Sequence, residues 1–184
     1  MLPDTIAPTS FNKGRAMQRP SIMAAAILAI ASSFAVAAQP SAQATFDELK
    51  TLEGNWQSTS GKTTVNYKLI ANGSSLVETW TMSPTRQSMT VYTMDGDRII
   101  ATHYCPQGNA PRLQLASTAE DGTHFFEFLD GANLGKPEGS HEHAFWVRLD
   151  GKGTLVRNET YIANGATYDP KKDVGSVEAF VRVK

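Results

Sequence analysis

Turn-forming residues recur about every eight to twelve positions from Gly54 to the C-terminus, and this spacing constrains the fold more than any other feature of the sequence. The segments between the turns alternate apolar and polar residues, as half-buried strands do. Asp95-Gly96 is the clearest turn, because it joins two runs rich in β-branched and aromatic residues. The predicted strands are residues 54–60, 62–70, 75–83, 87–95, 97–105, 112–119, 122–130, 140–150, 153–162 and 175–183.

Most connections between these strands are too short for a crossover, so consecutive strands are expected to pair antiparallel. An open sheet of about ten strands would leave two unpaired edges, which closure removes. We therefore predict an all-β fold, an antiparallel up-and-down barrel of about ten strands, wide enough to hold a small ligand. By alternation, the side chains expected to face inward are Val65, Tyr67, Leu69, Leu76, Trp80, Met82, Leu113, Leu115, Phe126, Phe128, Phe145, Val147, Leu149, Val177, Ala179, Val181 and Val183.

A short helix is predicted ahead of the first strand, at residues 45–52. Thr45 can cap this helix, and Glu48 stands three residues later, as in a capping box. Phe46, Leu49 and Leu52 would then share one side of the helix.

The first 44 residues have the layout of a secretory signal peptide. Three basic residues precede a small, apolar run at residues 22–38, and Ala42-Gln43-Ala44 supplies a small-x-small cleavage site. The run is about 17 residues long, short of the ~20 that span a bilayer. We therefore expect residues 1–44 to be removed and residues 45–184 to form a periplasmic or secreted domain. An uncleaved anchor, cleavage after Ala37 and translation from Met17 are the alternatives.

The charge of the expected mature domain limits the classes of partner that it can bind. Three of the 17 basic and one of the 18 acidic residues lie in the leader, so 14 basic and 17 acidic residues remain, a net charge near −3. With no basic run, this argues against a nucleic-acid partner, and we expect no stable membrane insertion after cleavage. Cys105 is the only cysteine, so no intramolecular disulfide forms.

The order of a short helix, Gly54-Asn55-Trp56 and a β-meander resembles that of the lipocalin-like, or calycin, barrels. In that family the tryptophan of Gly-x-Trp closes one end of the barrel, often against an arginine from a late strand. The resemblance gives this role to Trp56, with Arg182 or Arg157 as the arginine.

A longer block, residues 91–113, is similar to a group of uncharacterised secreted bacterial lipocalin-like proteins. It carries Asp95-Gly96-Asp97, Thr102-His103-Tyr104-Cys105 and Gly108-Asn109-Ala110-Pro111-Arg112. In this group a later strand opens with a Gly-His-x-His-like element, and a Trp or Tyr before an Asn-Gly turn follows. The sequences in those places are Ser140-His141-Glu142-His143, which departs from the pattern at its first and third positions, and Tyr161-Ile162-Ala163-Asn164-Gly165. The resemblance covers most of residues 50–166 and implies a fold and a cavity more than an activity.

His141 and His143 are expected to share the inward face with Phe145. Two imidazoles two positions apart on a strand can bind one zinc-like ion at ~2.1 Å. The alternative is a polar, non-metal role at the mouth of the barrel. The candidates for a third metal ligand are His103, Cys105 and His124.

Ile99, Ala101, His103 and Cys105 share one face of their strand, which passes from apolar to chemically active. A Cys-His pair can form an activated nucleophile. However, such side chains start about 6.5–7 Å apart, and a single buried cysteine usually only fills space. No nucleophile-elbow pattern is present, so catalysis stays open and less favoured than binding.

A haem would need an axial histidine such as His103 or His141, and the chain has no attachment motif.

Two further sites have alternative interpretations. Asn109 and Arg112 could hydrogen-bond to a ligand carboxylate, but Arg112 faces solvent if Leu113 points inward. Glu78 is expected to face inward, where it could act in proton transfer near His103 or form a fixed pair with Arg157.

The leading prediction is a secreted or periplasmic barrel that binds a small, partly apolar ligand and needs no cofactor. A His-based metal or haem protein with weak activity is one alternative, and a non-catalytic envelope interaction module is another. The sequence leaves the ligand and the oligomeric state open. The residues expected at the ligand site are Glu78, Trp80, His103, Tyr104, Cys105, Asn109, Arg112, His141 and His143.

Overall fold

The computed structural model describes residues 39–136 and 138–183. Most of the predicted leader therefore lies outside the described residues. Within them, no helix has the length and apolar character that a membrane crossing requires. The elements are α1 (Ala42–Lys50), β1 (Gly54–Ser58), β2 (Thr64–Ile70), the 3-10 turn η1 (Ala71–Gly73), β3 (Ser75–Ser83), β4 (Arg86–Asp95), β5 (Arg98–Tyr104), β6 (Ala110–Thr118), β7 (His124–Ala132), β8 (Ser140–Leu149), β9 (Thr154–Ala163) and β10 (Ser176–Val183).

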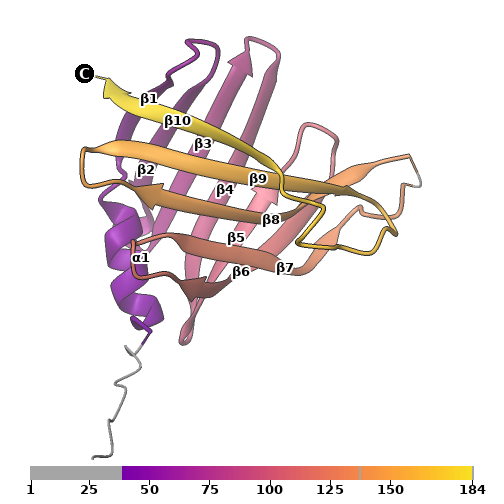
Figure 1. Cartoon of the computed structure of the whole chain (residues 1–184), viewed down its shortest axis with the longest axis horizontal. Coiled ribbons are helices and arrows are strands. Elements are labelled where there is room, and N and C mark those ends of the chain that lie inside the picture. The colour runs from indigo at the N-terminus through magenta and orange to yellow at the C-terminus, as the bar shows by residue number, and fades with distance from the viewer. Residues whose placement is uncertain (1–38, 137, 184) are drawn as a thin grey trace, which may run out of the picture. The chain divides into compact units, whose positions relative to one another are not determined.

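The ten strands form a closed antiparallel barrel in sequence order, which confirms the predicted fold (Figure 1). Closure occurs at β1, where Trp56 is paired with Val65 of β2 on one side and with Arg182 of β10 on the other. Every predicted strand is present, and each of its ends lies within two residues of the predicted position. The turn-forming residues therefore predicted the positions of all ten strands.

The helix begins three residues earlier than predicted, at Ala42, and Thr45 does not cap it. Ser41 has an extended backbone, and its Oγ accepts a hydrogen bond from the Ala44 amide at 3.2 Å. Thr45 is instead buried, with its hydroxyl 3.5 Å from that of Thr118 on β6. The apolar side of the helix was predicted correctly, because Phe46 and Leu49 pack into the barrel core.

Trp56 and Arg182 close the end of the barrel that α1 covers. The indole Nε1 donates to the carbonyl of Leu52 at 2.8 Å, and the Arg182 guanidinium carbon lies 4.3 Å from the indole ring centroid. Of the two arginines that the sequence offered, Arg182 therefore lies on this tryptophan. Gly54 has φ +132°, and a Cβ there would lie 2.6 Å from Arg182 Nη1, so this position requires glycine.

Aromatic side chains pack against one another across the barrel interior. Phe126 and Phe145 stack with ring centroids 4.5 Å apart, and Tyr92 meets Phe126 edge-on at 5.7 Å. Trp80 and Phe180 make a second edge-on contact at 5.3 Å. The expected cavity is therefore filled at these positions by the protein's own side chains.

The inward face of β10 was predicted wrongly. Val177, Val181 and Val183 are exposed, and Phe180 is fully buried in their place. The register places Phe180 opposite Leu155 of β9 and Ser58 of β1, both of which are buried. A shift of one residue moves every side chain of a strand to the other face. Leu149, at the end of β8, is likewise exposed rather than inward.

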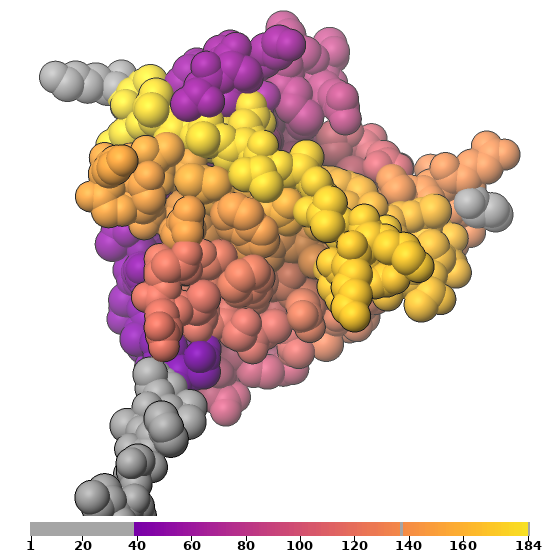
Figure 2. All heavy atoms as spheres, in the orientation of Figure 1, coloured from indigo at the N-terminus to yellow at the C-terminus, as the bar shows by residue number. Residues whose placement is uncertain are grey.

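The two ends of the barrel differ in their connections (Figure 1). At the end covered by α1, the connections are short, at residues 71–74, 96–97, 119–123 and 150–153. The opposite end carries the connections at residues 59–63, 84–85 and 105–109 and the two longest loops, at residues 133–139 and 164–175. We call this opposite end the loop end. In Figure 2 the orange and yellow atoms of the last two loops project from one side of the barrel.

Candidate functional site

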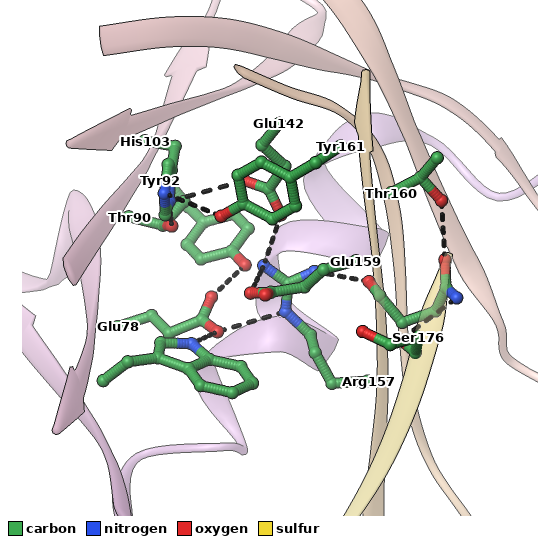
Figure 3. Close-up of polar contacts among 12 residues, drawn as sticks. Glu78, Thr90, Tyr92, His103, Glu142, Arg157, Glu159, Thr160, Tyr161 and Ser176 are labelled. Carbon is green, nitrogen blue, oxygen red and sulfur yellow. Dashed lines mark hydrogen bonds and ion pairs between the residues drawn. The ribbon is translucent and has the colours of Figure 1, made fainter. Parts of the chain in front are cut away.

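Arg157 of β9 lies at the centre of a cluster of buried charges (Figure 3). Its Nε donates to Glu78 Oε1 at 3.1 Å, and its Nη2 lies 3.5 Å from Glu142 Oε1 and 3.8 Å from Glu159 Oε1. The guanidinium carbon is 3.8 Å from the ring centroid of Phe145, so the cation also covers an aromatic face. We call the cluster the acid–arginine site and define it as Glu78, His103, Glu142, Arg157 and Glu159.

Glu78 has hydrogen-bond donors on both oxygens. Oε1 accepts from Trp80 Nε1 and from Arg157, and Oε2 accepts from the Tyr92 hydroxyl. Burial opposes ionisation of this carboxyl, but Arg157 and these donors outweigh burial and hold its pKa below the ordinary value. Of the two roles that the sequence left open for Glu78, the structure contains the fixed pair with Arg157.

A β-bulge places Glu142 in the site. The pairing of β8 with β9 shifts register between Glu142 and Ala144, so His143 is an additional residue. Glu142 is fully buried, opposite Tyr161 of β9, and lies beside Arg157. Simple alternation from Phe145 would have directed His143 and His141 inward and Glu142 outward, whereas after the bulge Glu142 lies inside the barrel.

His103 of β5 lies between Glu142 and Tyr161, near the loop end. Its Nδ1 is 3.0 Å from the Thr90 hydroxyl and 3.4 Å from Glu142 Oε2, and its Nε2 is 3.3 Å from the Tyr161 hydroxyl. The imidazole is 1% exposed, and burial lowers its pKa. Neutral His103 is therefore the form expected near pH 7. Tyr161 is 38% exposed, so the cluster extends from the interior to solvent.

The other two carboxyl groups resist ionisation. Burial, partly offset by Arg157, raises the pKa of Glu142 to about 7. Burial and the charge of Glu142 raise the pKa of Glu159 to about 7. Burial alone would lower the pKa of Arg157, but the surrounding carboxylates raise it above its ordinary value, so the guanidinium stays charged. Near pH 7 the site thus holds two acids that can gain or lose a proton.

Several buried polar atoms of this region have no hydrogen-bond partner among the described residues. They include both carboxylate oxygens of Glu142 and the Nη2 of Arg157. Another is the Oδ1 of Asn109, a residue that is 6% exposed and donates through Nδ2 to the Ser140 carbonyl at 2.8 Å. More than nine in ten buried polar groups in proteins are paired, so these atoms retain unused hydrogen-bonding capacity.

A pocket of about 460 Å³ opens among the loops at residues 105–109, 133–139 and 164–175. Its lining is mostly amide side chains, and two of them hold the loops in place. Asn164 donates to the Lys136 carbonyl at 2.8 Å, and Asn133 donates to the Gly108 carbonyl at 3.2 Å. The pocket is lined by Gln107, Asn109, Asn133, Lys136, Glu138, Gly139 and Asn164.

His141 and His143 lie together but apart from His103. Their rings are linked by a contact of 3.1 Å between Nε2 of His141 and Nδ1 of His143. His141 also contacts the Asn164 side chain at 2.8 Å, and His143 stacks on Phe128 at 5.0 Å between ring centroids. In residues 39–136 and 138–183, no three His, Cys, Asp or Glu side chains are grouped so as to hold a metal ion. His124, a candidate third ligand, lies near α1 instead, 3.5 Å from Glu48.

The remaining predicted site residues lie outside the cluster. Tyr104 is 48% exposed on β5. Arg112 is exposed and pairs with Asp130, as the outward alternative predicts. Cys105 is half-buried, and burial raises the pKa of its thiol, which opposes thiolate formation. Since both nitrogens of His103 already contact other side chains, the geometry offers this thiol no activating imidazole.

Sequence analysis found Glu78, Trp80 and His103 as inward residues but did not assign Glu142, Glu159 or Tyr161 to the site. Glu159 and Tyr161 stand two positions apart on β9, in step with Arg157, and this spacing was the available signal. No spacing in the sequence pointed to Glu142, because its inward position depends on the β-bulge at His143.

Comparison of the chain with protein-family models and with curated proteins returns no match.

Proposed function

We propose that this protein is a lipocalin-like barrel that binds a small, partly apolar ligand at its loop end, with the acid–arginine site as the polar anchor. The observation that carries the proposal is Glu142, a fully buried carboxyl group whose two oxygens have no hydrogen-bond partner among the described residues. Leaving a buried acceptor unpaired costs ~1–3 kcal/mol, more for a charged group. A ligand that supplies the donor would remove this cost.

The arrangement of the strands supports entry from the loop end. Three side chains of this region come from strand ends at the loop end. They belong to His103, Glu142 and Tyr161, each within three residues of the end of its strand there. The side chain of Glu159 is 21% exposed and that of Tyr161 is partly exposed, so the site has contact with solvent there. Because α1 and Trp56 cover the other end, the proposed route into the site runs past Tyr161.

The apolar part of the ligand is argued from the surroundings of the charges. Phe145 and Trp80 lie under the Arg157 guanidinium, and Tyr161 borders the entrance. Binding sites of this kind combine mostly apolar walls with a few polar groups that fix the orientation of the ligand. The small number of free polar atoms in this site favours a ligand with one polar group on an apolar body.

Native mass spectrometry of the untagged protein, purified without denaturation, tests the proposal. We expect a small molecule to co-purify with the wild-type protein and to be lost on denaturation. Its occupancy should fall in Glu142→Gln and remain in Glu120→Gln, a matched change of an exposed glutamate in a turn. Equal occupancy in the two variants, or a wild-type protein that carries no small molecule and binds none from an added library, would contradict the proposal.

We also propose that the protein is exported, as the layout of its leader indicates. Fractionation of cells that express the full chain should recover the barrel domain from the periplasm or the medium, with a mass reduced by that of the leader. Recovery of the uncleaved chain in the cytoplasm would contradict export without affecting the ligand proposal.

A further inference from the structure

The carboxyl groups of the acid–arginine site outnumber its cations. Glu78, Glu142 and Glu159 surround Arg157 with N–O distances of 3.1, 3.5 and 3.8 Å. The nearest other basic side chain in the described cluster is His103, whose lowered pKa keeps it neutral near pH 7. With all three carboxyl groups ionised, the site would carry two negative charges in excess of its one guanidinium.

The excess charge lies on Glu142 and Glu159 rather than on Glu78. Both oxygens of Glu78 accept hydrogen bonds, and one of them pairs directly with Arg157. Neither oxygen of Glu142 makes a hydrogen bond with the described residues, because Arg157 Nη2 and His103 Nδ1 approach them only to 3.5 and 3.4 Å and without hydrogen-bond geometry. A partner for Glu142 must therefore bring N–H or O–H groups into the site, and a positive charge would balance it.

We propose that the ligand of this barrel carries a protonated amine, which binds between the carboxyl groups of Glu142 and Glu159 with its apolar part towards Tyr161. This inference rests on the proposed function and specifies the class of ligand. An ammonium group has three N–H donors and no acceptor, so it meets the need of the unpaired oxygens of Glu142. It also brings the charge of the site closer to zero.

Other head groups match the site less well. An anionic head group could reach only the Nη2 of Arg157, because Nε is bonded to Glu78, and it would face three carboxyl groups around that one cation. A neutral hydroxyl would supply one donor and leave the excess charge unchanged. The charge and the hydrogen-bonding geometry therefore select the same class of ligand.

Binding of a cation should release protons. Burial holds part of the Glu142 and Glu159 populations in the protonated form near pH 7, and a bound ammonium would favour the ionised form. The affinity for an ammonium ligand should therefore rise between pH 6 and pH 8, through the pKa of about 7 of both groups. The charged or titratable side chains near these two carboxyl groups are Glu78, His103, Arg157 and Tyr161, together with Tyr67 and Cys105.

The test uses three probes with similar apolar bodies: 2-phenylethylammonium, 2-phenylethanol and 3-phenylpropanoate. Titration calorimetry at pH 8 should give a dissociation constant for the ammonium about tenfold lower than for the other two, the effect of one hydrogen bond to a charged group. This preference should disappear in Glu142→Gln and persist in Glu120→Gln. In the wild-type protein, the affinity for the ammonium should fall about tenfold from pH 8 to pH 6, and that for the alcohol should stay constant.

The outcomes of these titrations test the amine inference separately from the proposed function. Equal or tighter binding of the alcohol or the carboxylate by the wild-type protein overturns the amine inference and leaves the proposed ligand-binding barrel intact. A preference that survives in Glu142→Gln also overturns it. If Glu142→Gln does not fold, the pH series on the wild-type protein decides, and an ammonium affinity that is constant from pH 6 to pH 8 rejects the inference. If none of the three probes binds, the amine inference fails, and native mass spectrometry of the wild-type protein decides the proposed function separately.

Discussion

Arg182 lies over the indole ring of Trp56, 4.3 Å from guanidinium carbon to ring centroid, although the two residues belong to the last and the first strand of the barrel. The same guanidinium donates to the carbonyls of Glu53 and Thr51, at 2.5 and 2.9 Å, in the segment that joins α1 to β1. One side chain therefore links the closure of the barrel to the attachment of α1.

Replacing Arg182 by alanine should lower the free energy of unfolding by about 2 kcal/mol. The change removes a cation–π contact worth ~0.5–1 kcal/mol and two hydrogen bonds from a charged group. Urea unfolding followed by Trp fluorescence measures it. Arg98→Ala is the matched control, because Arg98 is an exposed arginine whose partner is Asp95 in a turn. An Arg182→Ala effect as small as that of the control would show that closure does not depend on this contact.

Gly54→Ala should be destabilising for two separable reasons. A residue with a Cβ is strained at φ +132°, at a cost of ~1–3 kcal/mol, and the Cβ would lie 2.6 Å from Arg182 Nη1. In an Arg182→Ala background only the strain remains. The two substitutions should therefore be non-additive in a double-mutant cycle, with a smaller Gly54→Ala effect when Arg182 is absent. Strictly additive free energies would exclude the steric part.

A chain that starts at Thr45 should be less stable than one that starts at Gln39, by about 2 kcal/mol. The shorter chain lacks the N-cap of Ser41 and the hydrogen bond from the Thr118 amide to Gln39, 2.9 Å long. Ser41→Ala in the longer chain isolates the cap, worth ~1 kcal/mol. Thermal unfolding compares the three proteins. Equal stability of the two chains would show that the first turn of α1 contributes nothing.

The sequence predicts the strands of this fold well because its turns are local. Asp95-Gly96 specifies a hairpin without reference to distant residues, and the same holds for most other connections. The faces of the strands depend on partners instead. On β10, the run of valines from Val177 to Val183 suggested an inward face, but pairing with β9 and β1 places the one aromatic residue, Phe180, inside. Hydrophobic alternation alone does not separate these two registers.

The site was predictable where period-two alternation holds and not where it breaks. Glu78 and His103 follow the alternation of β3 and β5, and both lie in the acid–arginine site. At β8, one additional residue, His143, reverses the expected orientation and brings Glu142 inside. A bulge is fixed by the pairing of two strands, so neither strand reveals it alone.

Glu142→Gln should change how stability depends on pH. The folded protein keeps a proton on Glu142 up to about pH 7, whereas the unfolded chain releases it near the ordinary pKa of 4.5. The folded state thus binds more protons between these values, so raising the pH from 4.5 to 7 lowers the free energy of unfolding. The variant lacks this contribution, which is on the order of 3 kcal/mol when fully developed.

Urea unfolding at several pH values between 4.5 and 7.5 measures this effect as the difference between variant and wild type. The free energy of unfolding of Glu142→Gln should increase relative to that of the wild type as the pH rises. The free energy of unfolding of Glu120→Gln should follow that of the wild type throughout. His103, whose pKa is lowered, gives stability that increases with pH below about 6.5, and it does so in all three proteins. Parallel curves for Glu142→Gln and the wild type would contradict the raised pKa of Glu142.

Cys105 should react slowly with iodoacetamide in the folded protein. Burial raises the pKa of its thiol above the ordinary value of 9.0, and only the thiolate is alkylated. At pH 8 the rate should be lower than that of the urea-unfolded chain, and it should still be rising with pH above 9. His103→Ala should leave the rate unchanged, because the His103 nitrogens contact Thr90 and Tyr161 rather than the thiol. A rate that levels off near pH 7 and falls in His103→Ala would instead identify Cys105 as an imidazole-activated nucleophile, and the barrel would then have to be considered as an enzyme.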